Sequence, residues 1–136
     1  MLHIWWTCTQ VQPYWTQIAE IIRGATGCIL EHNAETFLLK LLPTNIPHSI
    51  TKLMFLTLTS ASTLLAKHWE KKQIPSTAEV TAMVTTTLDY EVILWNQTKI
   101  GKGSATAKKI WTTYTEKKNL QAAARDNANT DTTTKQ

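Results

Sequence analysis

The residues best suited to metal chemistry lie at the start of the chain. His3 and Cys8 are soft-metal ligands five positions apart, with two tryptophans between them. A zinc site requires four ligands, or three ligands and a water molecule. Cys28 and His32 would complete the set, but their spacing from the first pair fits no standard zinc pattern. The favoured interpretation is therefore that both cysteines are small buried hydrophobes and His3 is a surface cap.

We accordingly expect no cofactor, because zinc would bind only if further ligands were supplied from elsewhere. A single bridge between Cys8 and Cys28 is the alternative to two reduced thiols. Two cysteines do not form a disulfide framework, so reduced thiols in an intracellular protein are the favoured state.

A second group of candidates lies in the basic C-terminal half. Lysines can neutralise phosphates, and an exposed aromatic ring can stack on an unpaired base. The alternative is a solvated helix face with Trp111 turned inward, which the clustering of Ile110, Trp111 and Tyr114 on one side favours for the tryptophan. For the lysines, neither phosphate binding nor a solvated helix face is favoured over the other. The predicted nucleic-acid-binding residues are Lys99, Lys102, Lys108, Lys109, Trp111, Lys117 and Lys118.

Catalytic patterns are absent from the sequence. There is no Gly-x-Ser-x-Gly motif, and no Cys, His and Asn set that the sequence singles out. The segment 101–104 (Gly-Lys-Gly-Ser) lacks the upstream glycine and the adjacent Lys-Ser/Thr pair of a phosphate-binding loop. We therefore predict a turn at this segment, no small-molecule substrate and no enzymatic activity.

Composition indicates one helical domain. The chain has 136 residues, of which 43% are hydrophobic and 18% charged, so most of it should fold. Glycine and proline number four each, which favours long helices. The net charge of +4 falls entirely in residues 67–136. No signal peptide is visible, and the uncharged run at 53–66 is too short to span a bilayer. We therefore expect a protein of the cytoplasm or nucleus that does not associate with a membrane.

The hydrophobic spacing predicts the first three helices. One begins at Pro13 and ends near Arg23, where Gly24 and Gly27 follow, and its apolar stripe includes Trp15. A short buried helix is expected over 34–42, before a proline. A long central helix is expected from 47 to about 72. It has a wide apolar face opposite a polar one.

Two further helices and a tail complete the prediction. Ser76 and Glu79 form a capping box that begins the fourth helix, although 84–87 has a strand-like β-branched bias. The last helix should run from Ser104 to about Lys118. We therefore predict an all-α single bundle of four or five helices over 1–118 and a disordered polar tail over 119–136. The fourth helix is expected to bury Val80, Val84, Leu88, Val92 and Trp95.

The order of several short patterns resembles a known family. The opening His-Ile-Trp-Trp-Thr-Cys, followed by Val-Gln-Pro-Tyr-Trp at 11–15 and by Ile18, is similar to the segment after the reverse transcriptase domain in vertebrate LINE (non-LTR) retrotransposon polyproteins. The similarity continues through Phe37-Leu38-Leu39, Ala66-Lys67-His68-Trp69, and Pro75-Ser76 with Glu79. It fades after Trp111.

This resemblance carries expectations about the opening stretch and about function. In that family a histidine and a cysteine close a Cys-x3-Cys-x7-His-x4-Cys motif, and His3 and Cys8 match its last two positions. The first two cysteines would precede Met1, so a truncated, unoccupied knuckle-like motif is expected. The polymerase and endonuclease domains are not in this chain. The resemblance implies a non-catalytic remnant with weak RNA or single-stranded nucleic-acid binding.

Two alternatives remain open. The chain could be a helical protein–protein interaction module, which self-associates through exposed Trp5 and Trp6. It could also be an open reading frame fragment with no selected function.

Overall fold

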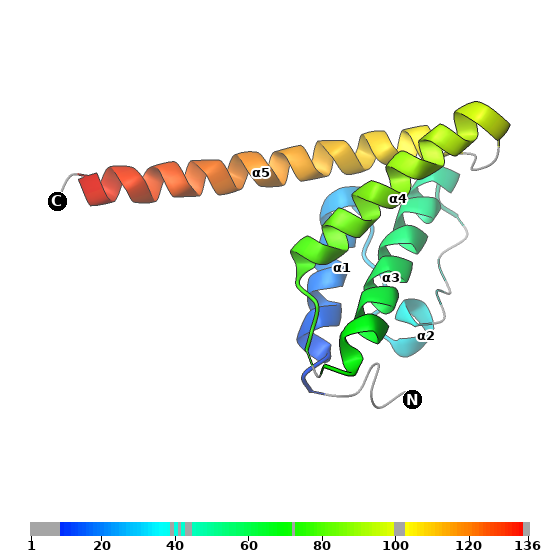
Figure 1. The fold of residues 1–136 in the computed structure, drawn as a ribbon, viewed down its shortest axis with the longest axis horizontal. Helices are drawn as coiled ribbons and strands as arrows, with labels where there is room; N and C mark the ends of the chain where they lie inside the picture. Colours follow the sequence, from blue (N-terminus) through cyan, green and yellow to red (C-terminus); the bar gives the residue numbers. More distant parts are fainter. Residues whose placement is uncertain are drawn as a thin grey trace.

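The computed structural model describes residues 9–38, 40, 42, 45–71, 73–99 and 103–134, with side chains as far as 125. Within these ranges the chain forms five helices and no strand, which confirms the all-α prediction. Helices α1, α3 and α4 form a compact group, while α5 crosses one end of it and projects away (Figure 1). The helices are α1 (Gln12–Thr26), α2 (Ala34–Phe37), α3 (His48–Trp69), α4 (Thr77–Thr98) and α5 (Ser104–Thr134).

Helix α3 is the centre of the bundle, as its wide apolar face predicts. It packs against α1, α4 and α5. Among the described helices it is the one long and apolar enough to cross a membrane, but half of that apolar stretch is buried inside the bundle. Packing against three helices therefore accounts for its composition without a membrane. Its buried side chains include Leu53, Met54, Leu58, Ala61, Leu64 and Leu65.

Helix α1 buries the predicted stripe, which includes Trp15 and Ile18. The hydroxyl of Tyr14 donates a 2.7 Å hydrogen bond to the carbonyl of Ala61 and so ties α1 to α3 inside the core. Gly27 ends α1 in a left-handed conformation with φ 77°. The prediction that Gly24 also ends the helix is wrong, because Gly24 lies within α1.

Helix α2 is shorter than predicted. Asn33 caps it by accepting a 2.8 Å hydrogen bond from the amide of Thr36, and the helix ends at Phe37 rather than near 42. Lys40 has a φ of 58°, a left-handed conformation that cannot continue a right-handed helix. Phe37 is fully buried and packs edge-to-face on Trp15 at 5.7 Å.

Helix α4 begins with the predicted capping box. The amide of Glu79 donates to the Ser76 hydroxyl and the amide of Ser76 donates to the Glu79 carboxylate, each at 3.2 Å. This cap outweighs the strand-like bias of 84–87, which is helical. The prediction that Val92 and Trp95 are buried is wrong, since both are partly exposed. The C-terminal end of α4 extends past the end of α3, where fewer helices remain to cover it (Figure 1).

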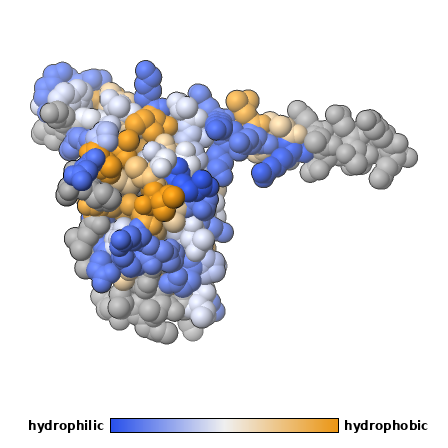
Figure 2. Space-filling model, turned by 180° about the vertical axis from the view of Figure 1, so that it is seen from behind, coloured by the Kyte–Doolittle hydropathy of each residue, from blue (hydrophilic) through white to orange (hydrophobic). Residues whose placement is uncertain are grey.

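Helix α5 continues beyond Lys118, where the sequence predicts its end, and reaches Thr134. Residues 119–125 are all exposed. Leu120 is the one large apolar residue among them, and it too is 72% exposed. In Figure 2 the part of α5 next to the bundle is mainly hydrophilic, with a small hydrophobic area further out. The packed domain therefore ends near Lys118, and residues 119–125 of α5 present their side chains to solvent.

Candidate nucleic-acid interface

The predicted lysines do not form one continuous patch. Lys102 lies outside the described residues. Lys108 forms an ion pair with Asp89 on α4, with 2.8 Å between Nζ and Oδ1. Lys99 occupies the left-handed cap of α4, and its ammonium lies 5.4 Å from the centre of the Trp95 ring. Lys99 and Lys108 are therefore already engaged within the protein.

Trp111 is turned inward and packs in the core, which was the alternative to stacking on a base. Its side chain is 2% exposed, and its indole nitrogen donates a 2.8 Å hydrogen bond to the Thr85 hydroxyl. A base cannot stack on a ring that is enclosed by α4 and α5. The assignment of Trp111 to a nucleic-acid-binding surface is therefore corrected, and its aromatic neighbour Tyr114 is the more accessible ring.

Lys109 and Lys117 lie on one face of α5, separated by about two helical turns or roughly 12 Å along the axis. Both are exposed and, with Thr113, they line a shallow pocket of about 430 Å³ beside Gly24 and Ala25 of α1. No carboxylate is among the described residues that line this pocket. The two lysines therefore present uncompensated positive charge next to the C-terminal turn of α1.

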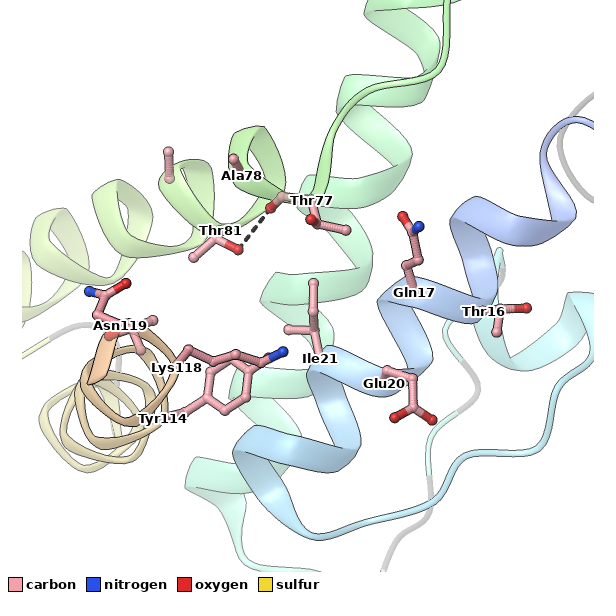
Figure 3. A pocket seen from close by; sticks show the side chains of 12 residues that line it. Thr16, Gln17, Glu20, Ile21, Thr77, Ala78, Thr81, Tyr114, Lys118 and Asn119 are labelled. Carbon is pink, nitrogen blue, oxygen red and sulfur yellow. Dashed lines mark hydrogen bonds between the residues drawn. The ribbon is translucent and has the colours of Figure 1, made fainter. Parts of the chain in front are cut away.

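Tyr114 separates this pocket from a larger groove of about 660 Å³ between α1, α4 and α5. The ring approaches α1 closely, because a Cβ atom added to Gly24 would lie 2.6 Å from Tyr114 Cε1. Lys118 runs along the other side of the ring, with its ammonium 5.9 Å from the ring centre and directed towards Ile21 (Figure 3). Burial, followed by the nearby Glu20 carboxylate, raises the pKa of Tyr114.

The negative charge at this groove is largely compensated by α1 itself. Glu20 forms a 2.6 Å ion pair with Arg23, one turn further along. The hydrogen bond from Arg23 and its positive charge lower the pKa of Glu20, and the charge of Lys118 lowers it further. Because Arg23 already neutralises Glu20, the lysines on α5 keep a net positive potential at the mouth of the groove.

The metal candidates are only partly described. His3 and Cys8 lie outside the described residues, as do Trp5 and Trp6. Where the structure describes the chain, no group of three or more His, Cys, Asp and Glu residues could hold a metal ion. Cys28 is a partly buried free thiol.

The groove contains residues that sequence reasoning missed. Gln17, Thr81 and Asn119 come from three different helices, and none belongs to a recognisable motif. Only the approach of α1 and α5 brings them together, so no local pattern could have indicated them. In comparisons with protein-family models, curated proteins and solved structures, the chain has no significant match.

Proposed function

We propose that this chain is a non-catalytic module that binds RNA or single-stranded nucleic acid weakly through the exposed side of α5. The observation that carries the proposal is the position of Lys109, Lys117 and Lys118. Each is exposed, and none forms an ion pair with a described carboxylate. Between Ser104 and Arg125 the helix has five basic residues and one acidic residue, so phosphates would meet a favourable potential along it.

The three lysines would contact phosphates along one strand. Lys109 and Lys117 lie on one side of Tyr114 and Lys118 lies on the other, so a backbone following α5 would pass all three. Long lysine side chains adapt to a flexible strand, but three such contacts supply limited affinity. The expected binding is therefore weak, salt-dependent and largely independent of sequence.

The resemblance to the segment after the LINE reverse transcriptase domain supports the same proposal. That resemblance runs from His3 to Trp111 and implies a role in holding template RNA without catalysis. We propose on this basis an origin in a retrotransposon polyprotein. Zinc would enter such a module only if ligands besides His3 and Cys8 came from elsewhere.

A salt titration with a matched control tests the phosphate contacts. For three contacts to a single strand, the logarithm of affinity should fall with the logarithm of salt with a slope of about −2, or about twentyfold between 50 and 200 mM. Replacing Lys109 and Lys117 by glutamine should reduce that slope by about 1.4. Lys108→Gln is the control, because Lys108 is already paired with Asp89 and should change binding little.

Two results would contradict this proposal. One is affinity that does not change between 50 and 200 mM salt, since phosphate contacts must release counterions. The other is the absence of any binding at 50 mM salt. Circular dichroism of the double variant should show unchanged helix content, because both lysines are exposed.

A protein–protein interaction module is the second candidate, and one feature of α4 favours it. Tyr90 and Ile93 are 64% and 55% exposed and lie one turn apart on the same face. Hydrophobic atoms also gather on one face of the bundle (Figure 2). Sedimentation from micromolar to submillimolar concentration tests self-association: a strict monomer that binds no hydrophobic dye would count against this function.

A further inference from the structure

We infer that the groove between α1, α4 and α5 accepts one unpaired nucleobase and so makes the protein prefer single strands to duplexes. The inference rests on the proposed nucleic-acid binding and names the part of the ligand that enters the fold. It depends on three properties of the groove: its apolar surface, its two amide side chains, and Lys118, with Lys117 in the neighbouring pocket.

The lining suits a flat, largely apolar ring. Ile21 of α1 forms the floor (Figure 3). On the α4 side, Ala78 and Ala82 line the groove together with two threonines. Tyr114 of α5, partly buried, faces them across the groove (Figure 3). At about 660 Å³ the groove is within the usual size of small-ligand pockets, roughly 300–1,000 Å³. A base placed there would lie between the tyrosine ring, along which Lys118 runs, and the methyl groups of α4.

The polar groups around the lining match the edge of a base. Gln17 of α1 and Asn119 of α5 both line the groove, and the side-chain amide of neither forms a hydrogen bond with a described residue. Each amide offers two donors and one acceptor, the combination that pairs with base edges. The Thr81 hydroxyl is not available in the same way, because it donates to the Thr77 carbonyl at 2.8 Å (Figure 3).

The lysines connect this groove to the strand path along α5. Lys118 lines the groove itself, while Lys117 lines the neighbouring pocket, on the opposite side of Tyr114. A strand whose phosphates meet both lysines would therefore have a base beside Tyr114. A base in a duplex is stacked and paired, and cannot turn into the groove without unpairing. The expected consequence is a preference for single strands that phosphate contacts alone do not produce.

Filling the groove tests the inference separately from phosphate binding. Ala82→Phe adds an aromatic side chain to the lining of the groove at an exposed position of α4, whereas the lysines belong to α5. Thr86→Phe is the matched control, because Thr86 is also exposed on α4 but does not line the groove. The probes are a fluorescent 15-nucleotide adenylate RNA and the same strand annealed to its complement, both measured at 50 mM salt.

The wild type should bind the single strand about tenfold more tightly than the duplex, the effect of one stacked base. Ala82→Phe should remove that preference and leave duplex affinity unchanged, while Thr86→Phe should retain it. Replacing both Gln17 and Asn119 by alanine should weaken single-strand binding several-fold, and these exposed positions do not endanger folding.

The possible failures are distinguishable. Equal affinity of the wild type for both probes overturns the base-binding groove and leaves the phosphate contacts standing. The same holds if Ala82→Phe, folded by circular dichroism, keeps the full single-strand preference. No binding of either probe overturns the groove together with the proposed function.

Discussion

The distances between Gly24 and Tyr114 predict how the substitution Gly24→Ala changes the free energy of unfolding. In a helix interior, alanine is more stable than glycine by about 1 kcal/mol. A Cβ at Gly24 would, however, lie 2.6 Å from Tyr114 Cε1 and 3.3 Å from Cδ1, so the ring must move by about 1 Å. Tyr114 also packs on Trp111 at 5.4 Å between ring centres, and such overpacking costs about 2 kcal/mol.

Gly24→Ala should therefore lower the free energy of unfolding by about 1 kcal/mol in the natural background. In a Tyr114→Ala background the obstruction is gone, and Gly24→Ala should raise it by about 1 kcal/mol. The coupling energy between the two positions is thus about 2 kcal/mol, within the range found for residues in contact. Urea unfolding followed by circular dichroism and tryptophan fluorescence measures all four proteins.

Gly27 provides the matched control for this cycle. It has a φ of 77° and nothing within 4 Å of an added Cβ, so Gly27→Ala should cost about 1 kcal/mol through backbone strain alone. That cost should be the same in both backgrounds. If Gly24→Ala stabilises the protein equally with and without Tyr114, the close approach of α1 and α5 is refuted, and with it the position of Tyr114 between the shallow pocket and the groove.

Two further predictions concern the core and the helix caps. Tyr14→Phe removes the buried hydrogen bond to Ala61 and should lower the free energy of unfolding by about 1 kcal/mol at pH 7 in urea titrations. Burial, and then the charge of Glu79, raise the pKa of Tyr14 above its ordinary value of 10.0. Above pH 10 the folded state keeps a proton that the unfolded state loses, so stability falls by at most about 1.4 kcal/mol per pH unit. Tyr14→Phe should remove that contribution, and identical pH slopes for both proteins would contradict it. Ser76→Ala, which breaks the capping box, should cost about 1 kcal/mol, and a thermal midpoint unchanged by it would argue against the cap.

Helix positions followed from local patterns because local forces decide them. The apolar stripe through Trp15 and Ile18 and the Ser76 capping box both correspond to features of the structure. Spacing of 3.6 residues places side chains on one face, and a cap needs only neighbouring residues. The left-handed turn at Lys40, which shortens α2, has no comparable signal because lysine does not favour that conformation.

Burial at the helix ends was less predictable. Val92 continues the apolar period of α4, yet it is partly exposed. Whether an apolar side chain is covered depends on the length of the neighbouring helices, which periodicity does not encode. For Trp111 the sequence left base stacking open while favouring inward packing, and the structure, in which the ring is 2% exposed and donates a hydrogen bond to Thr85, agrees with packing.

The sequence by itself determined that this protein is helical and where its basic residues lie, because composition, periodicity and caps act over a few residues. Only the tertiary structure decided which lysines remain free. Lys108 and Lys109 are adjacent in sequence, but one meets Asp89 of α4 and the other faces solvent beside α1. The groove likewise requires α1, α4 and α5 to meet, and its lining residues are distant in the chain; Gly24, beside it, lets Tyr114 of α5 approach α1 closely.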